Sequence, residues 1–192
     1  MSTFMSTSPS NAPQTVRSSG GIVELTPTEL SQAIHARDVS CVDVLDAFQA
    51  QIDRFNPQVN AIVAPMPREA LRAQAAELDA QLARGESRGL MHGFPQAPKD
   101  IMPAKGMVTT RGSPIFKGQV SQIDAVVFER MRASGALFVG RTNSPEFGLG
   151  GHTYNEVYGT TRNAFDPSRS AGGSSGGAAV SVALHMLPLA DG

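Results

Sequence analysis

The stretch "SAGGSSGGAAVSVALHMLPLADG", residues 170–192, places two adjacent serines between two pairs of glycines and then becomes apolar. The small apolar residues after the glycines predict a helix that begins inside the Gly-Ser segment and runs to about His185. Pro188 favours the end of that helix, and Leu187–Ala190 predicts the beginning of a strand. The function of the segment therefore depends on what the paired serines do at the start of a helix.

Three interpretations of the Gly-Ser segment are open. A flexible linker has this composition, although linkers do not usually lead directly into a helix rich in alanine and valine. An anion-binding loop would use the free N–H groups of the helix start, but neither Gly-Lys-Ser/Thr nor G-x-G-x-x-G is present there. A catalytic turn would use the glycines to admit a substrate close to the backbone and the serine hydroxyl.

A catalytic serine needs a partner that removes its proton, because the hydroxyl has a high pKa. Among the four histidines, His35 and His185 lie on predicted helices, and we interpret both as ordinary surface or core residues. His92 and His152 lie in glycine-rich loops and are weaker candidates for the base.

Lys99 is the stronger candidate for the base. It lies in "FPQAPKDIMPAKG", where apolar and proline residues predict that it is drawn out of water. Burial disfavours the ammonium ion, lowers the pKa of a lysine and lets the neutral amine accept a proton near neutral pH. The alternative is an exposed lysine that pairs with its neighbour Asp100.

Composition excludes several classes of function. A net charge of −1 with scattered Lys and Arg gives no basic surface for nucleic acid and none for a membrane. The single cysteine, Cys41, cannot pair within the chain, which is consistent with a reducing, cytoplasmic location. Residues 1–21 are rich in Ser, Thr and Pro and are expected to form a disordered tail, with one domain over residues 22–192.

The order of predicted elements favours an α/β architecture. Capping boxes at Thr26 and Ser40 predict two helices, of which the second should stop at Asn56-Pro57. The other predictions are a strand at 59–64, helices at 68–85 and 124–132, a strand at 136–140, a short helix at 144–146 and loops over 89–118 and 148–170.

Four stretches, in order along the chain, carry a resemblance to the amidase signature family of serine amidohydrolases. They are "LMHGFPQAPKD", "GMVTTRGSPIF", "DAVVFERMRASGALFVGRTNSPEFGLGG" and "NEVYGTTRNAFDPSRSAGGSSGGAAVSVA". The resemblance extends roughly over residues 24–192 and departs from the family at Arg141, where lysine is common. It implies a mixed β-sheet flanked by helices, of which this chain holds the N-terminal part with an incomplete sheet.

The resemblance also implies roles for individual residues. Lys99 corresponds to the general base, and Ser174 to the bridging serine, which follows a cis peptide bond after Gly173. Gly148 corresponds to a position whose backbone lines the acyl site, so Gly148 and Ser174 are the expected substrate contacts. The residues expected to have structural roles near the site are Gly172, Gly173, Ser175 and Gly176.

The family's nucleophilic serine belongs to an Asp-x-Gly-Gly-Ser segment, and we expect it to lie beyond Gly192. The chain by itself is therefore expected to be inactive. The resemblance implies a small-molecule amide substrate and neither a metal nor an organic cofactor, and it leaves a homo-oligomer open. The alternatives are the amidase-type subunit of a tRNA-dependent amidotransferase, with acylated tRNA and partner subunits, and a non-catalytic remnant.

Overall fold

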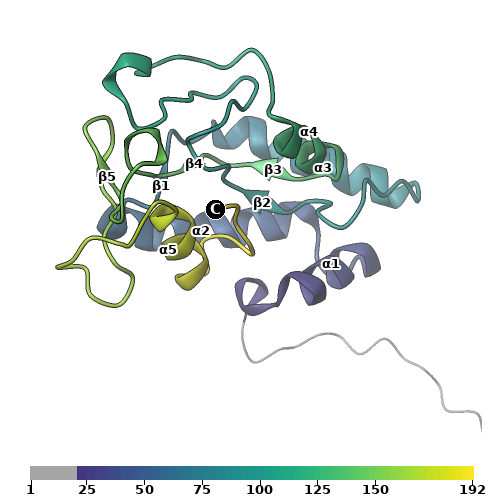
Figure 1. The fold of residues 1–192 in the computed structure, drawn as a ribbon. Coiled ribbons are helices and arrows are strands. Elements are labelled where there is room, and N and C mark those ends of the chain that lie inside the picture. Colours follow the sequence, from purple (N-terminus) through teal and green to yellow (C-terminus); the bar gives the residue numbers. More distant parts are fainter. Residues whose placement is uncertain (1–20) are drawn as a thin grey trace, which may run out of the picture.

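The computed structural model describes residues 21–192, so the tail expected at the N-terminus lies outside the described residues apart from Gly21. The described part begins with a short 3-10 helix, η1 (Ile22–Glu24), and three α-helices follow. These are α1 (Pro27–Ala36), α2 (Cys41–Val59) and α3 (Arg68–Ala83), and α2 packs against α3 (Figure 1).

Local capping determines where the first two helices begin, as predicted. The Thr26 hydroxyl accepts from the backbone N–H of Glu29, and the Glu29 carboxylate accepts from the N–H of Thr26. Ser40 and Asp43 form the same reciprocal pair at the start of α2. Each pair satisfies backbone donors that the first helical turn leaves free.

The prediction that the second helix stops at Asn56-Pro57 is wrong, because α2 continues through Pro57 to Val59. The side chain of Asn56 stabilises this extension. Its Oδ1 accepts from the N–H groups of Ala61 and Ile62 at 2.9 and 2.8 Å, and its Nδ2 donates to the Ile62 carbonyl. The expected strand at 59–64 is consequently reduced to β1 (Ile62–Val63).

Two pairs of short strands form the centre of the fold. β2 (Pro95–Gln96) pairs in parallel with β3 (Leu137–Phe138), and β1 pairs antiparallel with β4 (Arg141–Thr142). In the sequence between β2 and β3, the chain forms the 3-10 helix η2 (Pro114–Phe116) and then the helix α4 (Val126–Ala133). This order agrees with the prediction of a loop followed by a helix.

The C-terminal third is mostly loop, as predicted. It contains the 3-10 helix η3 (Glu146–Gly148), a hairpin of β5 (Tyr154–Asn155) and β6 (Gly159–Thr160), and the last helix, α5 (Gly176–Ala183). The strand predicted at 187–190 is wrong, because this segment forms no backbone ladder. The Leu189 carbonyl instead accepts from the side chain of Gln96 at 3.1 Å.

The main apolar core lies between the helices and the strands. α3 packs against β3, and α5 packs against β1 and β4, so helices flank the strands (Figure 1). Large buried apolar side chains of this core come from α1, α2, the segment that leads into β2 and the segment after α5, and they include Leu30, Phe48, Phe94 and Met186. A smaller cluster joins Phe128 of α4 to Phe138 of β3, with Ala104 and Met107 beside them.

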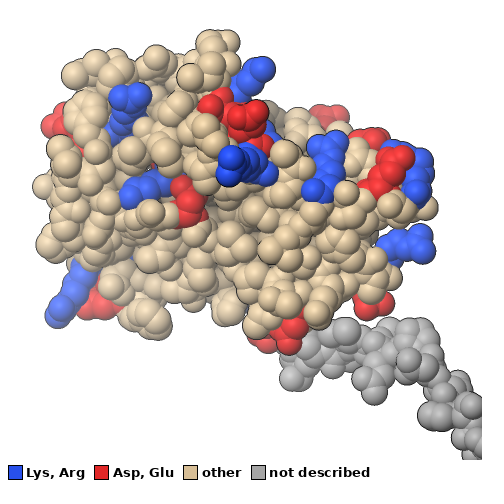
Figure 2. All heavy atoms as spheres, turned by 45° about the vertical axis from the view of Figure 1, so that its right-hand side comes forward, with Lys and Arg blue, Asp and Glu red and all other residues tan. Residues whose placement is uncertain are grey.

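Acidic and basic side chains are interspersed on the face drawn in Figure 2, without a block of one sign over any element. This distribution agrees with the scattered charges of the sequence. Across residues 21–192 the helices are too short or too polar to cross a bilayer.

Candidate active site

Lys99 lies in a turn just after β2, and backbone hydrogen bonds fix its position on two sides. On one side the Pro98 carbonyl accepts from Thr142 N–H at 3.1 Å, next to a parallel bridge between Lys99 and Thr142. On the other side the Lys99 N–H donates to both carboxylate oxygens of Asp191, at 3.2 and 3.0 Å. The lysine therefore emerges from a backbone that is held in place.

The Lys99 amine reaches both serines of the Gly-Ser segment. Its Nζ lies 2.9 Å from the Ser174 Oγ and 2.8 Å from the Ser175 Oγ, across about 75 residues of sequence. The alternative of an exposed pair with Asp100 is wrong. The Asp100 carboxylate is buried and accepts instead from the backbone and hydroxyl of Thr110.

Burial lowers the pKa of Lys99, and the attraction of the Asp191 carboxylate opposes this effect. The direction agrees with the expectation from the sequence that apolar surroundings favour the neutral amine. Burial also raises the pKa of Asp191, whose hydrogen bond from the Lys99 backbone and attraction to Arg141 and Lys99 act in the opposite direction.

The glycines of the Gly-Ser segment allow close backbone packing. A Cβ at Gly176 would lie 2.3 Å from the Thr153 Oγ1, and one at Gly177 would lie 2.4 Å from the Asn143 nitrogen. The N–H groups of the same glycines donate to the Thr153 hydroxyl and the Asn143 carbonyl. Two donors of the helix start are therefore already used, which disfavours both the anion-binding loop and the flexible linker.

The Gly173–Ser174 peptide bond is cis, as the resemblance implies. Ser175 is the N-cap residue of α5, but its side chain makes no capping hydrogen bond within the described part of the chain. Its hydroxyl points instead to Lys99. The sequence did not reveal this contact, because residues at the N-cap ordinarily turn their hydroxyl toward their own helix.

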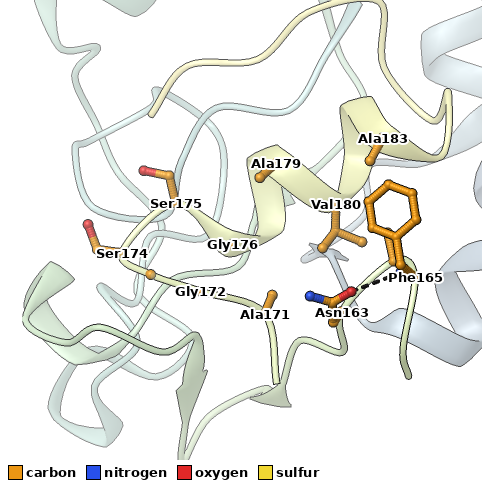
Figure 3. A pocket seen from close by; sticks show the side chains of 12 residues that line it. Asn163, Phe165, Ala171, Gly172, Ser174, Ser175, Gly176, Ala179, Val180 and Ala183 are labelled. Atoms are coloured by element: carbon orange, nitrogen blue, oxygen red, sulfur yellow. Dashed lines mark hydrogen bonds between the residues drawn. The ribbon is translucent and has the colours of Figure 1, made fainter. Parts of the chain in front are cut away.

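A cavity of about 340 Å³ opens beside the two serines. Figure 3 shows Ser174 and Ser175 at one end of this space, with the apolar side chains of Ala179, Val180 and Ala183 along α5. Gly172, Gly173 and Gly176 also line it, and the loop of Asn163 to Phe165 forms the opposite wall. The site thus joins a polar end to a mostly apolar wall.

Gly148 closes η3 with a positive φ of 75°, a conformation that favours glycine. A Cβ there would lie 3.5 Å from the Ile101 side chain, two residues after Lys99, so Gly148 adjoins the turn of the candidate base. Its role at an acyl site stays a prediction.

In the described part of the chain, the side chains of the loop histidines do not bond to the candidate base or to the two serines, although the backbone of His152 forms a bridge with Gly172. His92 is buried, its Nδ1 accepts from the Arg88 N–H, and its Nε2 lies 3.0 Å from the Leu78 carbonyl. Within residues 21–192 neither His92 nor His152 forms a side-chain hydrogen bond with Lys99, Ser174 or Ser175.

A buried polar network supports the Gly-Ser segment from behind, and the sequence did not reveal it. Asn143 donates through Nδ2 to Thr161, and Asn155 donates to the Asn143 Oδ1 at 2.7 Å. Thr153 bridges the Gly172 carbonyl and the Gly176 N–H. The sequence shows these residues only as polar residues of predicted loops and strand ends. Their hydrogen-bond partners lie 12 to 23 positions away in the chain, so no local pattern predicts the network.

Comparison with known proteins gives consistent matches. The family model for Amidase matches residues 43–192. The chain is 42% identical over 171 residues to a glutamyl-tRNA(Gln) amidotransferase subunit of Acidothermus cellulolyticus, covering 89% of this chain and 34% of that protein. It is 40% identical over 168 residues to an acylamidase of Rhodococcus erythropolis, covering 88% of this chain and 35% of that enzyme.

A solved bacterial aryl acylamidase of the amidase signature family has the same fold over this region. The TM-score is 0.78 with 29% identity, over 86% of this chain and 34% of that one. The chain thus spans about a third of the length of the curated relatives it matches.

Proposed function

The chain belongs to the amidase signature family, and from this membership we propose that it is part of a hydrolase of carboxylic amide C–N bonds. In the proposed reaction Lys99 is the general base and Ser174 carries protons between it and a nucleophilic serine. The observation that carries this proposal is the 2.9 Å contact between the Lys99 Nζ and the Ser174 Oγ, made in a site that lowers the pKa of Lys99.

The proton steps follow from these two groups. The neutral Lys99 amine accepts the proton of the Ser174 hydroxyl while Ser174 accepts one from the nucleophile, whose oxygen attacks the amide carbonyl. The C–N bond of the tetrahedral intermediate then breaks, and the leaving amine takes the proton back along the same path. Water hydrolyses the resulting acyl-enzyme and releases the carboxylic acid.

The nucleophile in this proposal is a serine that lies beyond Gly192. Among the described residues, Ser174 and Ser175 are the serines whose hydroxyls contact Lys99. Ser175 contacts the lysine directly, so it does not extend a relay that runs from Lys99 through Ser174. We therefore expect that residues 1–192 alone do not turn over an amide.

A second candidate is the amidase-type subunit of a tRNA-dependent amidotransferase. The 42% identity to a glutamyl-tRNA(Gln) amidotransferase subunit favours it. The same lysine and serine would then release ammonia from an amide for transfer, and partner subunits would hold the acylated tRNA. Ammonia delivered to an acylated tRNA only in the presence of such subunits would distinguish this candidate from a free hydrolase.

The test is amide hydrolysis by two proteins: the 192-residue chain, and the chain extended by the coding sequence that follows it. We expect turnover of small aliphatic or aromatic amides only from the extended protein. Lys99→Met and Ser174→Ala should each lower its kcat/KM by about 10²- to 10⁴-fold, the usual contribution of general base catalysis. Lys105→Met, which removes an exposed lysine six residues away, is the matched control.

Three results would contradict the proposal. Full activity in the extended Lys99→Met protein would exclude Lys99 as the base. Turnover by the 192-residue chain that Ser174→Ala abolishes would place the nucleophile inside it. A following sequence without a serine in the Asp-x-Gly-Gly-Ser pattern would favour a non-catalytic remnant.

A further inference from the structure

Arg141, in β4, is a fully buried arginine next to the turn that carries Lys99. Its Nη2 donates to the Lys99 carbonyl at 2.8 Å and to the Met102 carbonyl at 2.6 Å. One side chain therefore joins the first and last residues of this turn, residues 99–102, which we call the lysine turn.

An extra residue in the strand directs Arg141 toward the lysine turn. The backbone around β2 accepts hydrogen bonds at every second residue, through the carbonyls of Phe94, Gln96 and Pro98. The N–H groups that donate to these carbonyls belong to Leu137, Val139 and Thr142. The first two donors are two residues apart, but the last two are three residues apart, so one extra residue lies between Val139 and Thr142. Such an insertion is a β-bulge, which changes the direction of a side chain and is frequent beside active sites.

The charge of Arg141 is balanced by carboxylates on both sides of Lys99. Its Nε lies 3.6 Å from the Asp100 Oδ1, and it is also attracted to Asp191, which binds the Lys99 backbone. The other titratable groups that act on Arg141 are Tyr158 and Arg132, and Asp191 is the one that acts on Lys99.

A purely structural role explains this arrangement poorly. Within the described residues, the Nε and Nη1 atoms of Arg141 are buried without a hydrogen-bond partner, and its guanidinium lies 5.6 Å from the Phe128 ring. Burying a cation is costly, and an apolar side chain of similar volume is often as stable or more stable. An apolar side chain would lose the two hydrogen bonds that Arg141 donates to the lysine turn.

We propose that Arg141 is a positioning residue that holds the lysine turn, and with it the Lys99 amine, against the two serines. The proposal rests on the proposed function, in which Lys99 is the base. A lysine at position 141 would keep the positive charge but could not reproduce the fork of the guanidinium. Without that fork the lysine turn opens and water reaches the Lys99 amine. The pKa of Lys99 then rises toward the ordinary value of a lysine, because the burial that lowers it is lost.

The experiment is an NMR titration of the folded chain, labelled with ¹³C in its lysines. The lysines of the chain are Lys99, Lys105 and Lys117. Lys99→Gln assigns the signal of Lys99. In Arg141→Met we expect the titration midpoint of Lys99 to rise toward the ordinary value of a lysine side chain, and in Arg141→Lys to rise less. Hydrogen exchange of the Asp100 amide, which donates to Thr142, should become faster by about tenfold or more, because a bond to a charged group is lost.

Arg132→Met is the matched control. Arg132 also packs on an aromatic ring, pairs with a carboxylate and donates to a loop carbonyl, but that carbonyl belongs to Lys105 outside the lysine turn. Removing it should lower stability and leave the midpoint of Lys99 unchanged.

Distinct results would overturn the two proposals. A folded Arg141→Met or Arg141→Lys with the midpoint of Lys99 and the exchange of Asp100 unchanged would refute the role of Arg141. If Arg141→Met does not fold, Arg141→Lys decides. A midpoint of Lys99 at the ordinary value of a lysine side chain in the unsubstituted chain would refute Lys99 as the base, and the exchange of Asp100 would still test Arg141.

Discussion

Substituting Gly177 by alanine is expected to destabilise the protein, although the same change inside a helix ordinarily stabilises it. An alanine Cβ would lie 2.4 Å from the Asn143 nitrogen and 2.6 Å from the carbonyl oxygens of Asn143 and Ala61. All three are backbone atoms, so no side chain can turn away to relieve the overlap. The Gly177 N–H also donates to the Asn143 carbonyl, and that contact must lengthen.

The magnitude follows from three contributions. Overpacking costs about 1–3 kcal/mol, and backbone neighbours place this site at the upper end. The weakened hydrogen bond costs about 1 kcal/mol more, and the helix propensity of alanine returns about 1 kcal/mol. The net loss of about 2–3 kcal/mol corresponds to a fall in Tm of roughly 4–12 °C for a chain of this size.

The assay is thermal and urea denaturation of the substituted chain beside Gly172→Ala. Gly172 is exposed, and apart from its two chain neighbours no described residue has a heavy atom within 4 Å of its Cβ position. We expect its stability to change by no more than about 0.5 kcal/mol. A Gly177→Ala protein as stable as the parent chain would refute the close packing of α5 on the 142–143 backbone.

Three further outcomes are expected. Asp191→Asn keeps an acceptor for the Lys99 N–H but removes the carboxylate charge, which opposes the effect of burial on the pKa of Lys99. The pKa of Lys99 should therefore fall further, and a rise measured by NMR would contradict this. Burial lowers the pKa of His92, so below about pH 6.5 the unfolded chain takes up a proton that folded His92 resists. Stability should then decrease with falling pH and decrease less steeply in His92→Gln, and identical slopes in urea titrations would exclude this cause. Thr26→Ala should cost about 1 kcal/mol through the lost capping box, whereas unchanged denaturation would show that the cap contributes nothing.

The elements that the sequence predicted well depend on neighbours in the chain. The capping boxes at Thr26 and Ser40 were readable because donor and acceptor lie three residues apart. The helix end at Pro57 was mispredicted because α2 accommodates Pro57 and ends only at Val59, where the Asn56 side chain binds the N–H groups of the residues that follow. The strand expected at 187–190 was mispredicted because an apolar run indicates burial and does not reveal whether a paired strand is available.

In the candidate site, too, features that depend on local sequence were predictable and contacts between distant residues were not. The ordered motifs brought Lys99 and Ser174 together correctly, since each motif is local and their association came with the resemblance. The contact of Ser175 with Lys99 and the bonds of Arg141 to the lysine turn were not predictable, because they join residues 39 to 76 positions apart. The extra residue between Val139 and Thr142, beside Arg141, has no signature in composition.

The central claim is that Lys99 is held in a site that favours its neutral form beside Ser174. The most direct measurement is the titration of the Lys99 side chain in the ¹³C-labelled, unsubstituted chain, with Lys99→Gln to assign its signal. We predict that Lys99 titrates below the ordinary value of a lysine side chain, because burial lowers its pKa. Titration of Lys99 at or above that ordinary value would contradict the claim, whatever the substituted chains show.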